Sequence, residues 1–204
     1  MSLTSVLTLP MNHEIFEWFK HKQMFLPRTK VPYEPDVLIG SATAQPKEGL
    51  LVSNAYFQLW PSVLLIKDAK IYTFWSLDKT VCHIWIGDNL FLNYLWHENN
   101  AITYTLNAIL KRYTKTERTK EDAIFLGYLC SQHDSKQNAF GILYAIPVTR
   151  SKLINNNYLT GKWMSIADLK KVYRKLEPWS KRIFDYIYEH PPIRKRLKLY
   201  QKNV

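Results

Sequence analysis

Residues 100–114 read NAITYTLNAILKRYT, and the rest of the chain is arranged around this stretch. Its apolar side chains recur every three or four residues. They are Ala101, Ile102, Leu106, Ile109, Leu110 and Tyr113. This spacing is typical of a helix with one apolar face, so it predicts a helix from 100 to 113 packed against a core. The stretch contains no aspartate or glutamate, which bears on function below.

The composition favours a folded, basic protein. The chain has 204 residues, is 47% hydrophobic and contains 13 Tyr, 9 Phe and 7 Trp, which favours a packed core over disorder. Its net charge of +11 favours contact with phosphate, nucleic acid or an anionic surface, and an ordinary basic surface fits equally well. Cys82 and Cys130 lie in apolar, strand-like runs, so we expect two reduced core cysteines and no disulfide.

No stretch predicts a membrane span. Residues 49–66 lack charged residues, but Ser53, Asn54 and Gln58 interrupt them, so a loop followed by a strand fits better. The N-terminus lacks the basic start and long apolar core of a signal peptide. We therefore expect a cytoplasmic protein with no membrane contact.

Strands are expected on both sides of the central helix, because apolar runs alternate with polar turns there. The expected strands are 56–66, 71–76, 81–86, 123–131 and 139–147, with a short one at 161–164. Ahead of them, a short helix is expected through 15–22. Residues 27–50 contain four prolines and two glycines and predict an irregular surface segment.

The C-terminal part predicts helices. Ser165 and Asp168 resemble a capping box, which predicts a helix that starts there and continues to Leu176. Pro178 predicts that a second helix starts there and continues to Tyr188. We expect one domain over 1–192, with an N-terminal helical and irregular extension. A basic tail at 193–204 is expected to be mobile and weakly packed.

Several short motifs resemble one branch of the Nudix superfamily, a branch labelled as phosphoesterases. They cover roughly residues 20–188, although each match is short. The motifs are FLPR at 25–28, WPSVLL at 60–65, WIG at 85–87, GKWMS at 161–165 and LEPWSK at 176–181. The resemblance implies an α/β (α+β) fold, a Nudix-like α/β/α sandwich with a mixed sheet.

The resemblance also implies a specific chemistry. Nudix enzymes carry the pattern GX5EX7REUXEEXGU, whose glutamates lie on one helical face and hold a divalent metal, usually magnesium. The metal bridges a diphosphate while water attacks one phosphorus. If Leu106 takes the aliphatic position of that pattern, the Arg-Glu pair falls on 104–105 and the Glu-Glu pair on 108–109, and neither contains an acid.

A second register gives the same result. If Glu98 aligns with the first glutamate of the pattern, the Arg-Glu pair falls on 106–107 and the Glu-Glu pair on 110–111. Lys111 would then lie where a cation should bind, which is electrostatically unfavourable. Gly87 matches the first glycine of the pattern, but it lies too far from Glu98. The catalytic residues of the family are therefore not transferred to this chain.

Two functions follow from these observations. In the first, the chain has lost metal-dependent hydrolysis and is a nucleotide- or anion-binding regulatory module, with Arg28, Lys111 and Arg112 as ligand-binding candidates. No cofactor and no metal site are expected. The partners would be a nucleotide or another phosphorylated small molecule, with nucleic acid as a second class. The oligomeric state is open, with a homodimer among the alternatives.

The alternative is an active Nudix hydrolase that uses magnesium through ligands in unusual places. It would cleave a nucleoside diphosphate linked to another moiety. Glu98 and Glu121 are its catalytic candidates, and Glu117 and Asp122 are the other nearby acids. An acid at a helix start or in a charged loop has ordinary structural reasons, which favours the first function.

Overall fold

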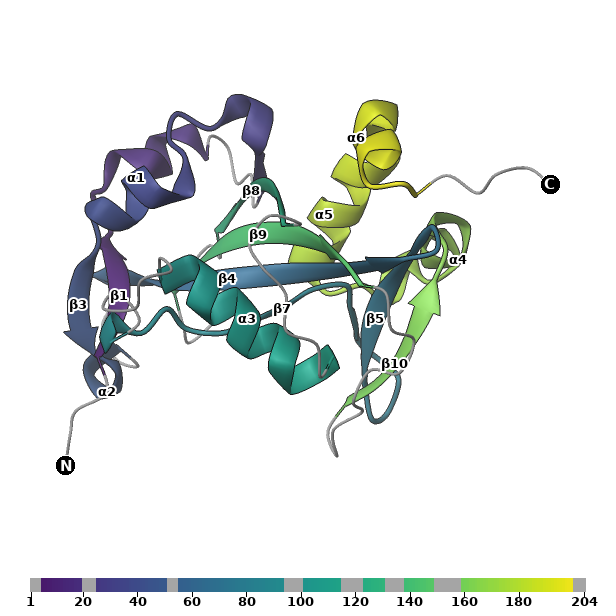
Figure 1. The fold of residues 1–204 in the computed structure, drawn as a ribbon, viewed down its shortest axis with the longest axis horizontal. Helices are drawn as coiled ribbons and strands as arrows, with labels where there is room; N and C mark the ends of the chain where they lie inside the picture. Colours follow the sequence, from purple (N-terminus) through teal and green to yellow (C-terminus); the bar gives the residue numbers. More distant parts are fainter. Residues whose placement is uncertain are drawn as a thin grey trace. The chain divides into compact units, whose positions relative to one another are not determined.

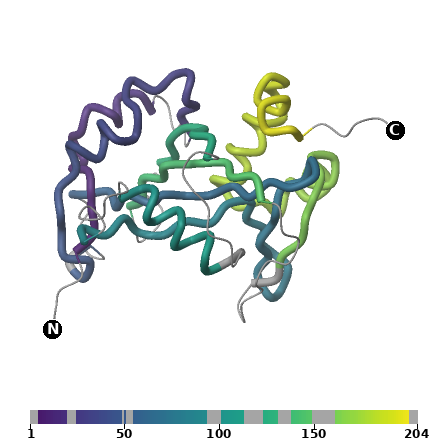
Figure 2. The backbone as a smooth tube through the Cα atoms, viewed as in Figure 1, coloured from purple at the N-terminus to yellow at the C-terminus, as the bar shows by residue number. Residues whose placement is uncertain are grey.

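The computed structural model describes residues 5–19, 25–50, 55–93, 101–114, 123–130, 138–148 and 159–199 (Figure 2). The chain forms two compact units. Unit 1 comprises Met1–Ser62, Gly87–Ala108 and Phe125–Tyr144, and unit 2 comprises Val63–Ile86, Ile109–Ile124 and Ala145–Val204.

Unit 1 contains strands from its first and its last segment (Figure 1). Strand β1 (Ser5–Pro10) pairs antiparallel with β3 (Thr43–Pro46) and with the start of β4 (Tyr56–Lys67). Strand β2 (Phe25–Pro27) pairs antiparallel with β8 (Ile124–Cys130). The sequence did not predict β1, because a strand this short is stabilised by its two partners rather than by a local pattern.

An aromatic cluster forms much of the core of unit 1. Phe16 lies 4.4 Å from Phe57 and 5.6 Å from Phe140, measured between ring centroids. Phe19 and Tyr128 also contact Phe140, at 5.7 Å and 5.2 Å. These tilted and edge-on arrangements are the favoured geometries of aromatic pairs. The buried hydroxyl of Tyr128 donates to the carbonyl of Tyr33 at 2.9 Å, so this core residue keeps its polar group satisfied.

The proline-rich segment 27–50 is more regular than expected. It contains the 3₁₀ turn η3 (Arg28–Lys30), the helix α1 (Pro35–Gly40), β3 and the helix α2 (Lys47–Leu50). Pro35 occupies the first turn of α1, where a missing N–H costs nothing, so the proline starts a helix there instead of preventing one. The helix expected through 15–22 is a shorter 3₁₀ turn, η1 (Glu14–Trp18).

A hairpin and an added strand make the sheet of unit 2. The end of β4 pairs with β5 (Lys70–Ser76), and β10 (Leu159–Met164) pairs antiparallel with Ile71 to Ser76 of β5. Asp68 and Ala69 connect β4 and β5 with φ values of 48° and 59°. Two consecutive positive φ angles match the twist of a tight hairpin, which confirms the turn expected there.

The strand expected at 81–86 is interrupted. Two short strands replace it, β6 (Cys82–His83) and β7 (Ile86–Gly87). Between them, the N–H of Ile84 donates to the Ser180 hydroxyl at 3.1 Å. Because this N–H bonds to a side chain far along the sequence and not to a neighbouring strand, the strand is interrupted at Ile84. The local sequence alone predicts a continuous strand there.

Helices close the C-terminal part of unit 2. Helix α4 (Ile166–Lys171) starts at the predicted capping box, where the Ser165 hydroxyl accepts from the N–H of Asp168 at 3.1 Å. The 3₁₀ turn η6 (Tyr173–Lys175) follows, and α5 (Pro178–Glu189) begins at the predicted proline. Both predicted helix starts are therefore confirmed.

The basic tail expected at 193–204 is partly wrong. Helix α6 (Pro191–Arg196) includes its first residues. Leu197 and Leu199 are only 3% and 4% exposed, so this segment is packed where a mobile tail was expected. Two leucines within a basic segment are too few to form an apolar pattern, so the sequence did not predict their burial. Residues 200–204 lie outside the described part of the chain.

The sheet is mixed. In unit 1 the N–H of Gln58 donates to the carbonyl of Asn138, and in unit 2 the N–H of Val148 donates to the carbonyl of Ile66. The residue numbers rise together, so β4 and β9 (Ala139–Pro147) run parallel, whereas the other pairs above are antiparallel. The strand order is β10-β5-β4-β9-β8-β2. The mixed sheet with helices confirms the predicted α/β class.

Both cysteines are buried thiols and form no disulfide, as expected. Cys82 lies in unit 2 and Cys130 in unit 1, and burial raises the pKa of each thiol to about 12. Among the described residues, no helix combines the length and the apolar character that crossing a bilayer requires.

Candidate functional site

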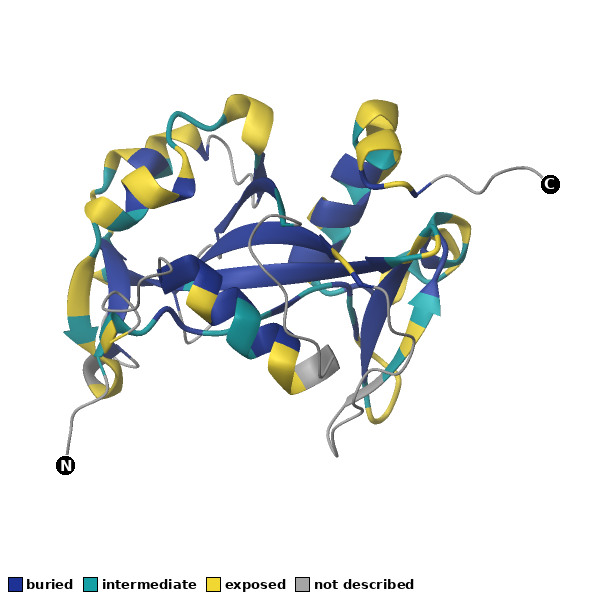
Figure 3. Cartoon of the chain, in the orientation of Figure 1, coloured by how far each residue is buried: buried dark blue, intermediate teal, exposed yellow. Residues whose placement is uncertain are grey.

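Helix α3 (Ala101–Thr114) is the element on which the implied chemistry depends, and its existence confirms the helix predicted at 100–113. Its apolar face is buried: Ile102, Leu106 and Ile109 are each at most 3% exposed (Figure 3). The predicted apolar stripe is therefore correct. Burial of this stripe against the core stabilises the helix.

The other faces of α3 offer no acidic ligand. Tyr104 is 37% exposed, Asn107 is half-buried, and Lys111 and Arg112 are exposed in the last turn. The Thr105 hydroxyl is buried and donates to the carbonyl of Ala101 at 2.9 Å, so it is engaged within the helix itself. Cations at this end of a helix complement its dipole, which gives Lys111 and Arg112 a structural reason to be there.

These residues do not fit a magnesium ion. Mg²⁺ in phosphate-processing sites takes oxygen ligands, with one or two carboxylates beside phosphate and water. Residues 101–114 contain no carboxylate. Across the described ranges, no group of three or more His, Cys, Asp and Glu side chains is placed to hold a metal. Glu98, Glu117, Glu121 and Asp122 lie outside the described residues, so their role stays a prediction.

The three ligand-binding candidates do not come from one unit. Arg28 belongs to unit 1, where its guanidinium lies 3.3 Å from the Glu34 carboxylate and both side chains are largely exposed. Lys111 and Arg112 belong to unit 2. The exposed ion pair between Arg28 and Glu34 contributes little to stability, about 0–1 kcal/mol. Arg28 therefore has a carboxylate partner, and its role in binding a ligand stays a prediction.

Glu177 organises a polar cluster in unit 2 that sequence reasoning missed. One carboxylate oxygen accepts from the Trp85 indole at 3.0 Å and from the N–H and hydroxyl of Ser180 at 3.0 and 2.9 Å. The other accepts from the N–H of Trp179 at 2.8 Å. Glu177 is thus the N-cap of α5. An acidic residue directly before Pro178 is a cap signal that the sequence did contain.

The same cluster fixes the segment around His83. The ring of His83 lies 3.7 Å from the Glu177 carboxylate, which is too long for a direct hydrogen bond. Burial lowers the pKa of His83, and the opposing attraction of Glu177 does not overcome it. The carboxylate already accepts several hydrogen bonds, so we interpret the cluster as a structural clamp between β6 and α5 rather than a catalytic pair.

Comparisons with known proteins identify the fold. No protein-family model and no curated protein matches the chain. The crystal structure of Tm1382, "a putative Nudix hydrolase", superposes with a TM-score of 0.74 at 14% sequence identity, covering 91% of this chain and 98% of that one.

Two weaker matches carry Nudix descriptions as well. A Nudix-family hydrolase from Clostridium perfringens has a TM-score of 0.47 at 10% identity, covering 71% of this chain and 98% of that one. The Nudix domain of Shewanella oneidensis NrtR, solved with ADP ribose, has a TM-score of 0.45 at 14% identity, covering 78% and 93%.

The chain has the Nudix fold. The likeness to Tm1382 over nearly the whole of both chains confirms the fold that the short motifs implied. At 14% identity it establishes the fold and not an activity. What the protein does has to be argued from its own residues.

Proposed function

We propose that this chain is a Nudix-fold protein that does not hydrolyse diphosphates through a metal on α3. It is a regulatory module that binds a nucleotide or another phosphorylated small molecule. One observation carries the proposal. Helix α3, to which the family resemblance assigns the metal-binding position, has buried apolar residues on one face and only neutral or cationic residues elsewhere.

Electrostatics favours an anion over a cation at this helix. Mg²⁺ is held by the charge of its ligands, and Tyr104, Asn107 and Lys111 cannot supply the charge of a carboxylate. Lys111 and Arg112 would repel a metal ion and attract a phosphate. The net charge of +11 acts in the same direction over longer range.

A small phosphorylated ligand is favoured over nucleic acid. Single-stranded nucleic acid is bound largely by stacking of bases on accessible aromatic rings. Trp75 and Trp179 are 8% and 3% exposed and belong to the core. The exposed rings are divided between the units: Trp18 and Tyr104 belong to unit 1 and Tyr188 to unit 2. Basic residues are numerous on the C-terminal helices, but a charged surface alone gives weak, non-specific binding.

The test is a hydrolysis assay titrated with magnesium over a panel of nucleotide sugars, dinucleotides and nucleoside triphosphates. We expect no turnover above background at any magnesium concentration. The same panel is titrated calorimetrically without metal, where we expect saturable binding of at least one compound.

Glu98→Gln and Glu121→Gln provide the controls, because they remove the acids on which the alternative depends. Magnesium-dependent turnover that disappears in either variant would establish the active hydrolase and refute the proposal. Absence of both turnover and binding across the panel would refute the binding role.

A further inference from the structure

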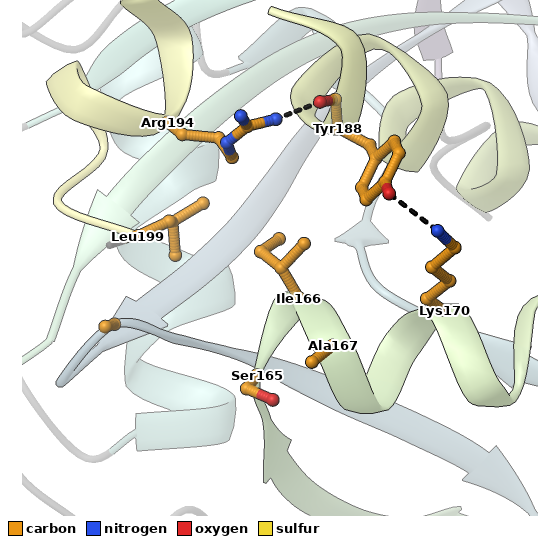
Figure 4. Close-up of a pocket in the computed structure, with 8 residues that line it drawn as sticks. Ser165, Ile166, Ala167, Lys170, Tyr188, Arg194 and Leu199 are labelled. Carbon is orange, nitrogen blue, oxygen red and sulfur yellow. Dashed lines mark hydrogen bonds between the residues drawn. The ribbon is translucent and has the colours of Figure 1, made fainter. Parts of the chain in front are cut away.

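A cavity of about 300 Å³ lies in unit 2, between the helices α4, α5 and α6 and the turn that connects β4 to β5 (Figure 4). Its lining combines aliphatic and polar side chains. They are Ala69, Ser165, Ile166, Ala167, Lys170, Tyr188, Arg194 and Leu199. A cavity of this size, with an apolar wall and a few polar groups, has the composition of a small-ligand site.

Lys170 and Tyr188 form a pair of adjacent donors at this cavity. The Lys170 ammonium donates to the Tyr188 hydroxyl at 2.6 Å. The ammonium has two further hydrogens, and the hydroxyl, which accepts from Lys170, still carries its own hydrogen. Because the nitrogen and the oxygen are in direct contact, the two oxygens of one carboxylate can accept from both groups at once.

The contact with Lys170 makes the Tyr188 hydroxyl a stronger donor. The hydrogen bond from Lys170 lowers the pKa of Tyr188, and the charge of Lys170 acts in the same direction. A more acidic hydroxyl donates more strongly to an anion, because neighbouring hydrogen bonds polarise one another. The ammonium also lies 4.7 Å from the centroid of the Tyr188 ring, a contact that holds it beside the tyrosine before any ligand arrives.

The charge of this donor pair selects the class of anion. Among the described residues, the Lys170 ammonium contacts Tyr188 and no carboxylate. Asp168, on the same helix, accepts from the Ser165 hydroxyl at 2.7 Å and pairs with Lys171 at 3.2 Å. One ammonium and one neutral hydroxyl match the single charge of a carboxylate better than the nearly double charge of a phosphate monoester.

Arg194 belongs to the wall of the cavity and not to the donor pair. Its Nη1 donates to the carbonyl of Tyr188 and, at 3.3 Å, to the carbonyl of Ile187, so the guanidinium is bound to the end of α5. Figure 4 shows Arg194 and Lys170 at opposite ends of Tyr188. A ligand at the Tyr188 hydroxyl therefore bonds to Lys170 without involving Arg194.

We propose that this cavity binds a small monocarboxylate, with its two oxygens at Lys170 and Tyr188 and its apolar part against Ile166, Ala167 and Leu199. Figure 4 shows Ile166 between Lys170 and Leu199, so the aliphatic wall begins beside the donors. The wall favours an acid with an apolar substituent, since acetate would leave most of it uncovered. The site is independent of the proposed nucleotide-binding role, because its ligand carries no phosphate.

Benzoate is the probe, because it joins one carboxylate to a compact apolar group. Its binding to the full-length protein is measured by an NMR titration, with benzamide, acetate and phenyl phosphate for comparison. Benzamide has the shape of benzoate without its charge, and acetate lacks the apolar group. We expect saturable binding of benzoate, at least about tenfold tighter than binding of benzamide or acetate and tighter than binding of phenyl phosphate.

Two pairs of variants test the donors. Lys170→Met should weaken benzoate binding at least about tenfold, whereas Lys171→Met, which removes the same charge one residue away on α4, should change it less than about threefold. Tyr188→Phe should weaken it at least about fivefold. Tyr173→Phe is its control, because the Tyr173 hydroxyl donates to Asp185 at 3.0 Å and lies outside the cavity lining; it should have less than about a twofold effect.

A third variant tests the cavity itself. Ala167→Trp keeps every charge and fills the space beside the donors, so it should abolish benzoate binding. Ala167 is exposed, and circular dichroism verifies that each variant is folded. Binding that survives Ala167→Trp would place the ligand elsewhere and overturn the site.

The remaining outcomes each decide one part of the proposal. Equal weakening by Lys170→Met and Lys171→Met would mean general attraction to a basic surface, and an unchanged affinity in Tyr188→Phe would overturn the paired donors. Benzamide binding as tightly as benzoate, or phenyl phosphate binding more tightly, would overturn the assignment to a monocarboxylate. Absence of benzoate binding would refute this site and leave the proposed function untouched, whereas magnesium-dependent hydrolysis of nucleotides would refute only the proposed function.

Discussion

Glu177 shows how one side chain can connect segments far apart in sequence. Its two oxygens accept from Trp85, Trp179 and Ser180, and the Ser180 hydroxyl in turn accepts from the N–H of Ile84. The rings of Trp85 and Trp179 also contact each other at 5.0 Å. The carboxylate is therefore both a helix cap and the acceptor that satisfies a partly buried indole.

Glu177→Ala should lower the free energy of unfolding by about 2–4 kcal/mol, because it removes the cap of α5 and leaves the Trp85 indole without its acceptor. Glu189→Ala, at the exposed end of the same helix, should change it by less than about 0.5 kcal/mol. Urea denaturation followed by fluorescence measures both. Equal effects of the two variants would contradict the clamp.

Gly127 is the position where the backbone requires a glycine. Its φ is +149°, and a Cβ there would overlap the carbonyl oxygen of Leu26 on β2 and lie 2.9 Å from the Cα of Pro27. Gly127→Ala should destabilise the protein by about 1–3 kcal/mol, the usual cost of forcing a strained backbone.

Gly40 is the matched control for Gly127. A Cβ at Gly40 would meet nothing within 4 Å, and the residue ends α1. Gly40→Ala should therefore be neutral or stabilise by up to about 1 kcal/mol, since alanine favours helix over glycine. Thermal unfolding of both variants gives the comparison. A larger loss of stability in Gly40→Ala than in Gly127→Ala would contradict the requirement for a glycine at Gly127.

At the scale of elements, periodic patterns and helix caps predicted the helices correctly. Features that depend on contacts between residues remote in sequence were not predicted. Helix α3 follows from its apolar spacing, and α4 and α5 follow from Ser165 and Pro178. The break between β6 and β7 depends on Ser180, almost a hundred residues away, so no local window contains its cause. Helix α6 was missed because Pro191 and Pro192 indicate a stop, whereas here they occupy its first turn.

The C-terminal segment gives the prediction at this scale. Leu199→Ala should destabilise the protein by about 2–5 kcal/mol, as other core leucines do, because the side chain is 4% exposed. Lys195→Ala, on the exposed side of α6, should leave the melting temperature within about 2 °C. If both variants have the same melting temperature as the unchanged protein, this segment does not contribute to the core.

For the whole molecule, the two thiols report on the two units separately. Cys130 belongs to unit 1 and Cys82 to unit 2, and burial raises the pKa of each to about 12. Because the thiolate is the reactive form, neither should react with an aromatic disulfide reagent at pH 8 while the protein is folded.

Denaturant should expose both thiols, and the single variants Cys82→Ser and Cys130→Ser assign each reaction to its unit. We expect the two native reaction rates to be slow and similar, since a cooperative fold opens as a whole. Rapid modification of one thiol in the folded protein would show that its unit opens independently.

The sequence alone determined the class of the fold, the central helix, most of the strands and the absence of carboxylates on α3, because these depend on composition and on patterns within a few residues. Only the tertiary structure decided the clamp at Glu177, the burial of Leu197 and Leu199, and the cavity at Tyr188. Each of these joins residues from separate elements, and such contacts are stabilised by packing and desolvation that no local spacing encodes.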